Sequence, residues 1–210
     1  MGAEHADDQY VHRTQPTSVS VVICTRNRAH LLPRALGPLA AEVAGDDEAE
    51  VLVVDSASTD ATCDVVHDLT NTVPSLRYHR LAAPGLSLAR EAALAEARHE
   101  VVAFLDDDAV VHPGWLGGVR EGFEDGDVAA VGGPIVLEWT GRRPRWMSAA
   151  LEQWYSGLDH GPAARDLGGT EYLWGANLAV RRSAASAVGG FGSQLGRIGS
   201  SLLSGEDIDL

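Results

Sequence analysis

Three aspartates, Asp106, Asp107 and Asp108, follow directly on the apolar run of residues 101–105. Adjacent carboxylates repel one another and resist burial without partners. A second apolar run, residues 51–54, also ends in an acid, Asp55. Carboxylate oxygens are the ligands that hard divalent cations such as Mg²⁺ and Mn²⁺ prefer. The pattern therefore predicts a cation site where two strands end; the alternative is an aspartate-rich polar turn before a helix that starts near Pro113.

The elements that must position these acids alternate along the chain. Strands are predicted from β-branched runs at residues 18–24, 50–55, 76–81 and 101–106. Helices are predicted at 30–43, from the capping residues 56–60 through 69, at 86–100 and at 113–123. Strands that alternate with helices indicate an α/β fold, a Rossmann-like, mostly parallel central sheet with helices on both faces.

In an open parallel sheet, ligands bind outside the carboxyl ends of the strands. Asp55 and the run from Asp106 to Asp108 should therefore face the same crevice. Alternation along an extended segment would place Asp106 and Asp108 on one side and Asp107 on the other. Asp106 and Asp108 are therefore the candidate metal ligands.

The second half of the chain has a different pattern. A strand bent at Gly132-Gly133 is expected at residues 128–139, followed by an aromatic-rich stretch, a polar loop at 156–170 and a strand at 172–182. Trp146 and Trp154 lie at near-helical spacing with Leu151, which favours core packing. The stretch at 142–155 is basic and then amphipathic, which also suits contact with a membrane surface.

One domain is expected to account for most of the chain. Residues 1–17 are predicted to be a disordered tail, and residues 18–210 a single domain with a nucleotide-binding half at about 18–126 and an acceptor-side half at about 127–210. The sequence ends in "SGEDIDL", which has the pattern of a helix start. We therefore expect the natural protein to continue beyond Leu210.

Composition excludes several classes of protein. The net charge of −14 and the pI near 4.8 argue against nucleic-acid binding. All 16 basic residues are arginine, so a P-loop NTPase, a protein kinase or a Schiff-base enzyme lacks its lysine. Two cysteines without a secretory signal favour a cytoplasmic protein. Such a protein could also contact the inner face of the membrane. No window of about 18 apolar residues predicts a transmembrane helix.

A dinucleotide-binding site is the main rival for this topology. It needs a glycine-rich turn after a strand so that the backbone can approach a pyrophosphate. Here the first strand continues into "CTRNRAHL", which contains no glycine. A diphosphate must then be held in another way, and a cation bound by Asp106 and Asp108 would serve.

Six stretches in order resemble the glycosyltransferase family 2 pattern on a GT-A fold: "SVVICTRNR", "EVLVVDSASTD", "PGLSLARE", "FLDDDAVVHPGWL", "GANLAVRR" and "GEDIDL". Together they span roughly residues 18–210. The resemblance implies a metal-dependent, inverting transfer of a sugar from a nucleoside-diphosphate sugar to the hydroxyl of a saccharide, a lipid-linked or a small-molecule acceptor. The implied cofactor is Mg²⁺ or Mn²⁺.

The resemblance also assigns roles to donor-side residues. It places Thr25 and Arg26 at the nucleotide pocket, Asp55 at the nucleotide base and Arg90 near the diphosphate. Asp108 is then the direct metal ligand and Asp106 contacts the ribose or the metal, with Asp107 beside them in the nucleotide-sugar site. The residues alone leave two alternatives. Asp55 could cap the helix that follows it, although Ser58 and Thr59 could cap this helix in its place. Arg90 could be a solvated residue on the surface of its helix.

On the acceptor side, the resemblance makes Asp207 the catalytic base and places Glu206, Asn177 and Trp174 near the acceptor. On the residues alone, Asp207 could equally be an acid at the N-terminus of a helix. The chain departs from the family pattern at Glu91, where the family usually has asparagine. Two rival functions are a degenerate nucleotide-binding module and a nucleotidyltransferase on a similar sheet.

Overall fold

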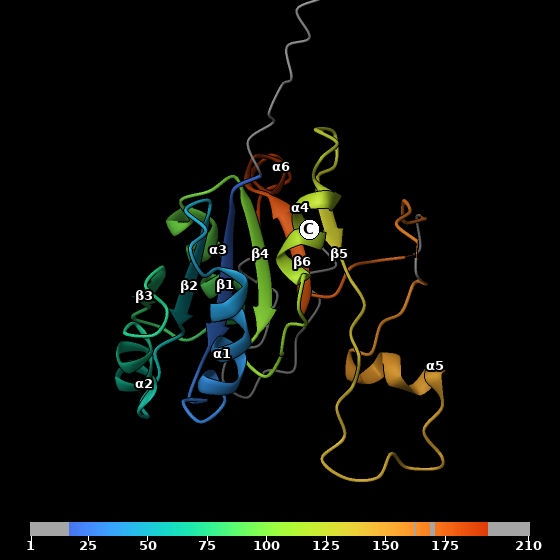
Figure 1. Ribbon diagram of the computed structural model, residues 1–210, viewed down its shortest axis with the longest axis horizontal. Coiled ribbons are helices and arrows are strands. Elements are labelled where there is room, and N and C mark those ends of the chain that lie inside the picture. The colour runs from blue at the N-terminus through green and yellow to red at the C-terminus, as the bar shows by residue number, and fades with distance from the viewer. Residues whose placement is uncertain (1–16, 162, 169–170, 193–210) are drawn as a thin grey trace, which may run out of the picture.

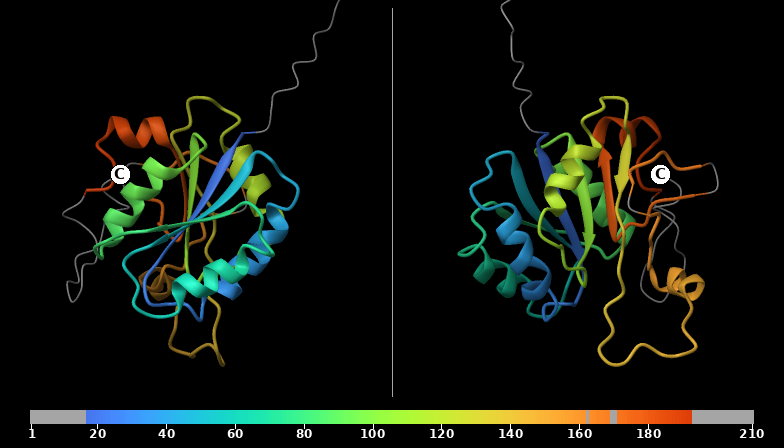
Figure 2. Two further views of the ribbon diagram at one scale, coloured as in Figure 1. Left: turned by 90° about the vertical axis from the view of Figure 1, so that its left-hand side faces the viewer. Right: turned by 45° about the vertical axis from the view of Figure 1, so that its right-hand side comes forward.

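The computed structural model of the chain describes residues 17–161, 163–168 and 171–192 (Figure 1). Predictions for Asp207, Glu206 and most of the N-terminal tail lie outside these residues. The described part is a central sheet with helices packed on both of its faces (Figures 1 and 2). The predicted α/β fold class is confirmed.

The sheet has six strands in the spatial order β3-β2-β1-β4-β6-β5. Neighbours among β3, β2, β1 and β4 run parallel, whereas β6 is antiparallel to both β4 and β5. The predicted mostly parallel sheet is thus correct, with the antiparallel strand β6 and the short strand β5 beyond it added at one edge. The strands are β1 Val19–Thr25, β2 Ala49–Asp55, β3 Leu76–Arg80, β4 Val101–Asp106, β5 Ala130–Gly132 and β6 Asn177–Arg181.

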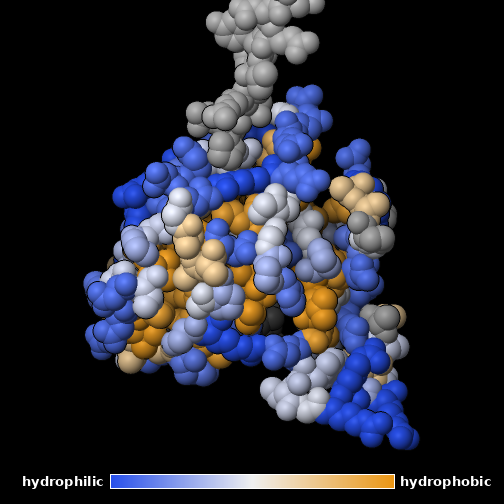
Figure 3. All heavy atoms as spheres, viewed as in Figure 1, coloured by the Kyte–Doolittle hydropathy of each residue, from blue (hydrophilic) through white to orange (hydrophobic). Residues whose placement is uncertain are grey.

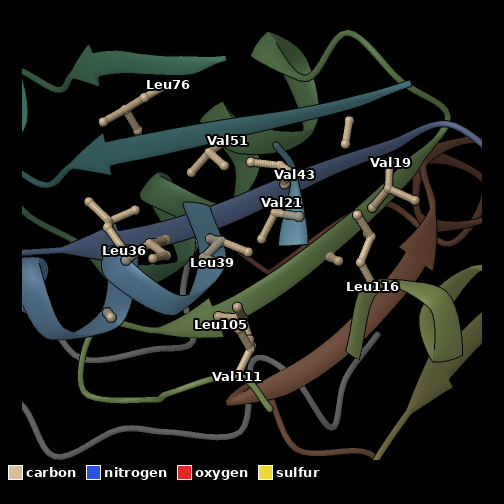
Figure 4. Packing of buried hydrophobic residues seen from close by; sticks show 14 of the residues in the cluster. Val19, Val21, Leu36, Leu39, Val43, Val51, Leu76, Leu105, Val111 and Leu116 are labelled. Atoms are coloured by element: carbon tan, nitrogen blue, oxygen red, sulfur yellow. The ribbon is translucent and has the colours of Figure 1, made fainter. Parts of the chain in front are cut away.

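Two hydrophobic cores cover the two faces of the sheet. On one face, Val21 and Val51 pack with the helices α1, α2 and α4, and Figure 4 shows this cluster. On the other face, Val22 and Leu52 pack with α3 and α6. Neighbouring strand residues alternate between the cores, as the pleat requires when both faces are buried. The helices are α1 Leu32–Glu42, α2 Thr62–Leu69, α3 Leu86–Glu96, α4 Trp115–Gly122, α5 Ala149–Glu152 and α6 Arg182–Ala187, with a 3₁₀ turn at Gln153–Tyr155.

The helix predicted from Pro113 begins two residues later, at Trp115. Gly114 precedes it with φ of 85°, in the left-handed region that favours glycine. Two backbone N–H groups at this helix start are satisfied from α1, since the Glu42 carboxylate accepts hydrogen bonds from Gly114 N at 2.9 Å and Leu116 N at 3.0 Å. Asp108 and Trp115 are therefore joined by a turn that α1 holds in place.

The strand predicted at 128–139 is much shorter than expected. Only residues 130–132 pair with β6, and the chain then leaves the sheet, with one further bridge between Ile135 and Leu158. We refer to residues 133–161 as the arm. It hangs beyond the end of the sheet at which the parallel strands finish, as both Figure 1 and Figure 2 show.

The core-packing interpretation of the two arm tryptophans was wrong. Trp146 is 67% exposed and Trp154 is 84% exposed. Near-helical spacing misled because α5 is a single turn that continues only as a 3₁₀ turn, so these side chains share no long helix face. Strongly hydrophilic residues cover the far end of the arm (Figure 3).

None of the helices in the described part of the chain has the length and apolar composition needed to span a membrane.

Candidate active site

The parallel strands β1, β2 and β4 deliver the predicted site residues to one edge of the sheet. In the strand register, Thr25 is paired with Asp55 and Cys24 with Asp106. Thr25 and Asp55 are buried, and Asp106 is partly exposed. The predicted meeting of Asp55 with the run from Asp106 to Asp108 at one end of the sheet is thus what the register produces.

The loops that follow β1 and β2 are joined by hydrogen bonds across this edge. Asn27 Oδ1 accepts from Thr59 N at 2.7 Å, and Asn27 N donates to Ser58 Oγ at 2.9 Å. Asn27 has φ of 54°, a left-handed conformation that asparagine tolerates better than most residues. Ala29 N adds a hydrogen bond to Asp60. These contacts fix the loop that carries Thr25, Arg26 and Arg28.

Asp107 is held inside this edge rather than pointing away from it. Only 5% of the residue is exposed, and its carboxylate accepts from Thr25 Oγ1 at 2.7 Å and from Arg28 Nη1 at 2.8 Å. Burial raises the pKa of Asp107, and the hydrogen bond from Thr25 and the charge of Arg28 only partly offset this effect. Asp107 is therefore a structural member of the site.

The predicted alternation, with Asp107 opposite Asp106 and Asp108, was wrong. Strand β4 ends at Asp106 and the chain turns, with Ala109 N donating to Asp106 O at 3.0 Å. Arg28 Nη1 consequently reaches both Asp107 and the exposed Asp108, the latter at 3.2 Å. Alternation applies to extended backbone only, and the turn removes it.

Arg28 is the residue of this site that sequence reasoning missed. The residues predicted to line the nucleotide pocket from this loop were Thr25 and Arg26. Arg26 is exposed and makes no side-chain hydrogen bond or ion pair within the described residues. The available signal was a basic residue three positions beyond the end of one strand, in a fold that brings this loop to the acids at the end of another.

Asp55 is 1% exposed, and both of its carboxylate oxygens have partners. One accepts from Ser58 N at 2.8 Å and the other from Tyr78 Oη at 2.5 Å. Burial and the hydrogen bond to Asp55 raise the pKa of Tyr78. Neither Asp55 nor the side chain of Ser58 or Thr59 caps α2. The first residue of this helix, Thr62, instead donates its backbone N–H to Asp60 at 3.1 Å.

Arg90 is buried at 4% exposure, so the alternative of a solvated helix residue was wrong. Its guanidinium carbon lies 6.0 Å from the ring centre of Phe104 and 5.4 Å from that of Phe191, which places the charge beside this edge-to-face aromatic pair. Gly175 lies directly against it. The next residue, Glu91, accepts a hydrogen bond from Phe191 N, which ties α3 to the segment after α6.

Asn177 and Trp174 lie on the β6 side of the same edge. Asn177 Oδ1 accepts from Trp115 Nε1 at 3.0 Å, and Asn177 Nδ2 donates to Pro134 O at 3.3 Å. Trp174 is partly exposed and packs edge-on against Tyr172, with ring centres 5.2 Å apart. Asn177 thus fixes the root of the arm beside α4.

The chemistry of the acids suits a hard divalent cation. The described residues contain no cluster of three or more His, Cys, Asp or Glu side chains able to hold a metal on their own. Mg²⁺ is commonly bound through one or two carboxylates together with substrate phosphates. Asp106 and the exposed Asp108 provide oxygen ligands of this kind. The residues present therefore fit a cation whose remaining ligands come from a bound diphosphate.

Solved structures identify the class of the fold. A mannosyltransferase from Pyrobaculum calidifontis, solved in complex with GDP-Man and Mn²⁺, superposes with a TM-score of 0.64 at 25% identity, over 87% of this chain and 49% of that chain. S. aureus TarS (residues 1–349) superposes with the same TM-score at 21% identity, over 91% of this chain and 53% of that chain. The fold is that of the GT-A glycosyltransferases.

The chain belongs to glycosyl transferase family 2, whose model matches residues 20–189. It is 28% identical to the succinoglycan biosynthesis protein ExoM of Rhizobium meliloti, over 91% of this chain and 59% of that protein. It is 31% identical to the pre-mycofactocin glycosyltransferase of Mycobacterium tuberculosis, over 91% of this chain and 38% of that protein. The chain therefore spans less than two thirds of the length of these relatives.

Proposed function

We propose that the chain carries the donor site of a metal-dependent glycosyltransferase, which moves a sugar from a nucleoside diphosphate to an acceptor hydroxyl with inversion. The observation that carries this proposal is the convergence of Thr25, Asp55 and the acids after β4 at one end of the sheet, in a member of a family of sugar transferases. Two neighbours support a nucleotide sugar as donor. They are the mannosyltransferase with GDP-Man and Mn²⁺, and TarS with UDP-GlcNAc.

In this proposal the edge of the sheet binds the donor by parts. Thr25 and Arg26 line the nucleotide pocket, Asp55 meets the base, and Arg90 adds positive charge toward the diphosphate. Asp108 and Asp106 would hold Mg²⁺ or Mn²⁺, which when bound stabilises the negative charge of the departing diphosphate. Asp107 keeps the acid run in position through its bonds to Thr25 and Arg28.

Asp207 is the proposed base that takes the proton from the acceptor hydroxyl as it attacks. A positioned carboxylate typically contributes 10²–10⁴-fold as a general base. Attack from the face opposite the leaving diphosphate inverts the sugar carbon. Glu206, Asn177 and Trp174 form the proposed acceptor side, and a partly exposed aromatic ring such as that of Trp174 suits stacking on a sugar ring.

A thermal-shift panel of nucleotide sugars, each with and without Mn²⁺, tests the donor proposal. A ligand that binds the folded state raises the melting temperature by mass action. We expect at least one donor to raise it, and to raise it further with Mn²⁺. Release of nucleoside diphosphate in a product assay supports transfer, whereas release of pyrophosphate indicates nucleotidyl transfer; donor binding without any turnover indicates a degenerate module.

The arm offers a surface for a lipid-linked acceptor or its membrane. Trp146, Trp154 and Tyr155 are all more than half exposed, and the arm also carries the exposed Arg142 and Arg145. Exposed tryptophan and arginine suit the interface of an anionic bilayer. Cys24 and Cys63 are free, consistent with a reducing cytoplasmic location at the inner face of the membrane.

Co-sedimentation with vesicles tests this surface. Binding to vesicles that contain anionic phosphatidylglycerol, lost in a Trp146→Ser, Trp154→Ser double variant, is the expected result. Membrane contact through the arm is contradicted if wild type does not bind the vesicles. It is also contradicted if the double variant binds them as well as wild type does.

A further inference from the structure

We propose that Arg28 is a built-in counter-ion of the acid run: it holds Asp107 in place permanently and occupies Asp108 until a divalent cation displaces it. This inference rests on the proposed metal-dependent transfer and adds a residue to it. Arg28 acts through the two carboxylates and is therefore a positioning residue.

The two contacts of Arg28 differ in a way that separates the two roles. Nη1 lies 2.8 Å from an oxygen of Asp107 and 3.2 Å from an oxygen of Asp108. The Asp107 side chain is 7% exposed, whereas that of Asp108 is 59% exposed. Removing the charge partner of a buried carboxylate is costly, whereas an exposed ion pair contributes little. The Asp107 contact is the fixed one, and the Asp108 contact is exchangeable.

The loop around Arg28 is built to keep the guanidinium in this place. Asn27 is anchored to Thr59 and Ser58, and Ala29 N donates to Asp60 at 3.1 Å. Arg28 thus lies between two residues that are both tied to the β2–α2 loop. A guanidinium is not deprotonated in proteins, so Arg28 keeps its positive charge.

A cation bound at Asp108 must compete with this guanidinium. The same Nη1 atom contacts both carboxylates, so a divalent ion that binds the Asp108 oxygens meets a positive charge nearby and repels it. The consequence is that Arg28 weakens metal binding in the absence of donor. A bound diphosphate adds negative charge and compensates both cations, which makes metal binding depend on the donor.

Binding of Mn²⁺ to the donor-free protein, measured by electron paramagnetic resonance titration, tests the competition. Arg28→Met is expected to bind Mn²⁺ roughly two- to fivefold more tightly than wild type, the range that corresponds to one exposed ion pair. Arg142→Met removes the same charge from the arm, where Arg142 makes no ion pair within the described residues, and should leave the affinity unchanged. Equal, weaker or undetectable binding by Arg28→Met overturns the proposal.

A second variant separates charge competition from a disturbed loop. Arg28→Lys keeps the positive charge, so its donor-free affinity for Mn²⁺ should remain near that of wild type; an increase equal to that of Arg28→Met contradicts competition by charge. Melting temperatures of all variants, measured without metal, verify that they are folded. If wild type releases nucleoside diphosphate but the Mn²⁺ affinities do not differ, the role of Arg28 fails and the proposed transfer stands.

Discussion

Arg90 on α3 and Gly175 before β6 lie in direct contact, so that a Cβ atom at position 175 would overlap the Arg90 guanidinium. Arg90 is buried against the rings of Phe104 and Phe191, with the Gly175 backbone also in contact with it. The glycine of "GAN" is thus explained by the approach of Arg90. This contact joins α3, which carries part of the proposed donor site, to the segment that leads into β6.

Gly175→Ala should therefore displace Arg90. Overpacking of this kind typically costs about 1–3 kcal/mol, which denaturant unfolding would measure as a lower free energy of unfolding. We also expect a smaller donor-induced rise in melting temperature. Gly117→Ala on α4 is the matched control, because a methyl group there meets nothing within 4 Å and should stabilise the helix by about 0.5–1 kcal/mol. Unchanged stability together with an unchanged donor-induced rise in melting temperature would contradict the displacement of Arg90.

Asn27 combines two features that substitution can separate. Its backbone is in the left-handed region, and its side-chain oxygen accepts a hydrogen bond from Thr59. Asn27→Gly keeps the backbone and removes the bond, for an expected loss of about 1 kcal/mol. Asn27→Ala should lose about 1–2 kcal/mol more, since alanine resists the left-handed region. Urea unfolding of both variants measures the difference; equal losses would indicate that φ at this position contributes nothing.

Sequence patterns predicted the parallel half of the protein because the same side chains satisfy several requirements at once. In β1, Val19, Val21, Val22 and Ile23 each pack into one of the two cores, and this leaves a run rich in β-branched residues that is visible without a structure. The end of that run then fixes where Thr25, Asp55 and Asp106 meet. These positions follow from strand length and parallel register alone.

The contacts of Arg28, Arg90 and Asn177 were beyond such patterns. Each depends on a partner 60 or more residues away, as between Arg28 and Asp107 or between Trp115 and Asn177. The direction of a side chain after a strand has ended depends on a turn, and no periodicity encodes it. In the arm, tryptophans at near-helical spacing predicted burial, but a single helical turn has no face to bury.

Glu50 gives the fold a dependence on pH at the end of the sheet remote from the site. Burial raises the pKa of Glu50, but hydrogen bonds from Ser20 Oγ, Arg98 N and Arg77 outweigh burial, so the pKa is lowered overall. A lowered folded-state pKa contributes stability that is present above the unfolded-state pKa, about 4.3, and is lost as the pH falls through the folded-state value.

Glu50→Gln should cost about 1–3 kcal/mol at pH 7 and flatten the decline of unfolding free energy between about pH 5 and pH 3. Denaturant titrations at a series of pH values would measure both effects. Asp47→Asn, at an exposed residue without a side-chain hydrogen bond in the described part of the chain, should keep the wild-type slope. A decline in Glu50→Gln as steep as in wild type would place the acid sensitivity elsewhere.

Asp207 is the base in the proposed mechanism, and its substitution should separate chemistry from binding. Asp207→Asn is expected to lower kcat by about 10²–10⁴-fold while the donor-induced rise in melting temperature stays at the wild-type value. Because an amide retains much of the shape and hydrogen bonding of the carboxylate, the fold should be preserved. Near-normal turnover would remove Asp207 from the mechanism.

Asn177 links the root of the arm to α4, and its proposed role on the acceptor side can be tested through its partner Trp115. Trp115→Phe removes the indole N–H that donates to Asn177 Oδ1 but keeps an aromatic ring in the core. If Asn177 acts by holding the root of the arm through this bond, Trp115→Phe and Asn177→Ala should each raise the KM for the acceptor, and the double variant should raise it by less than the product of the two effects. If Asn177 binds the acceptor directly and independently, the two effects multiply. Steady-state kinetics with the acceptor varied at saturating donor distinguishes these results, and the KM for the donor, whose proposed site lies at β1, β2 and the end of β4, should not change in either variant.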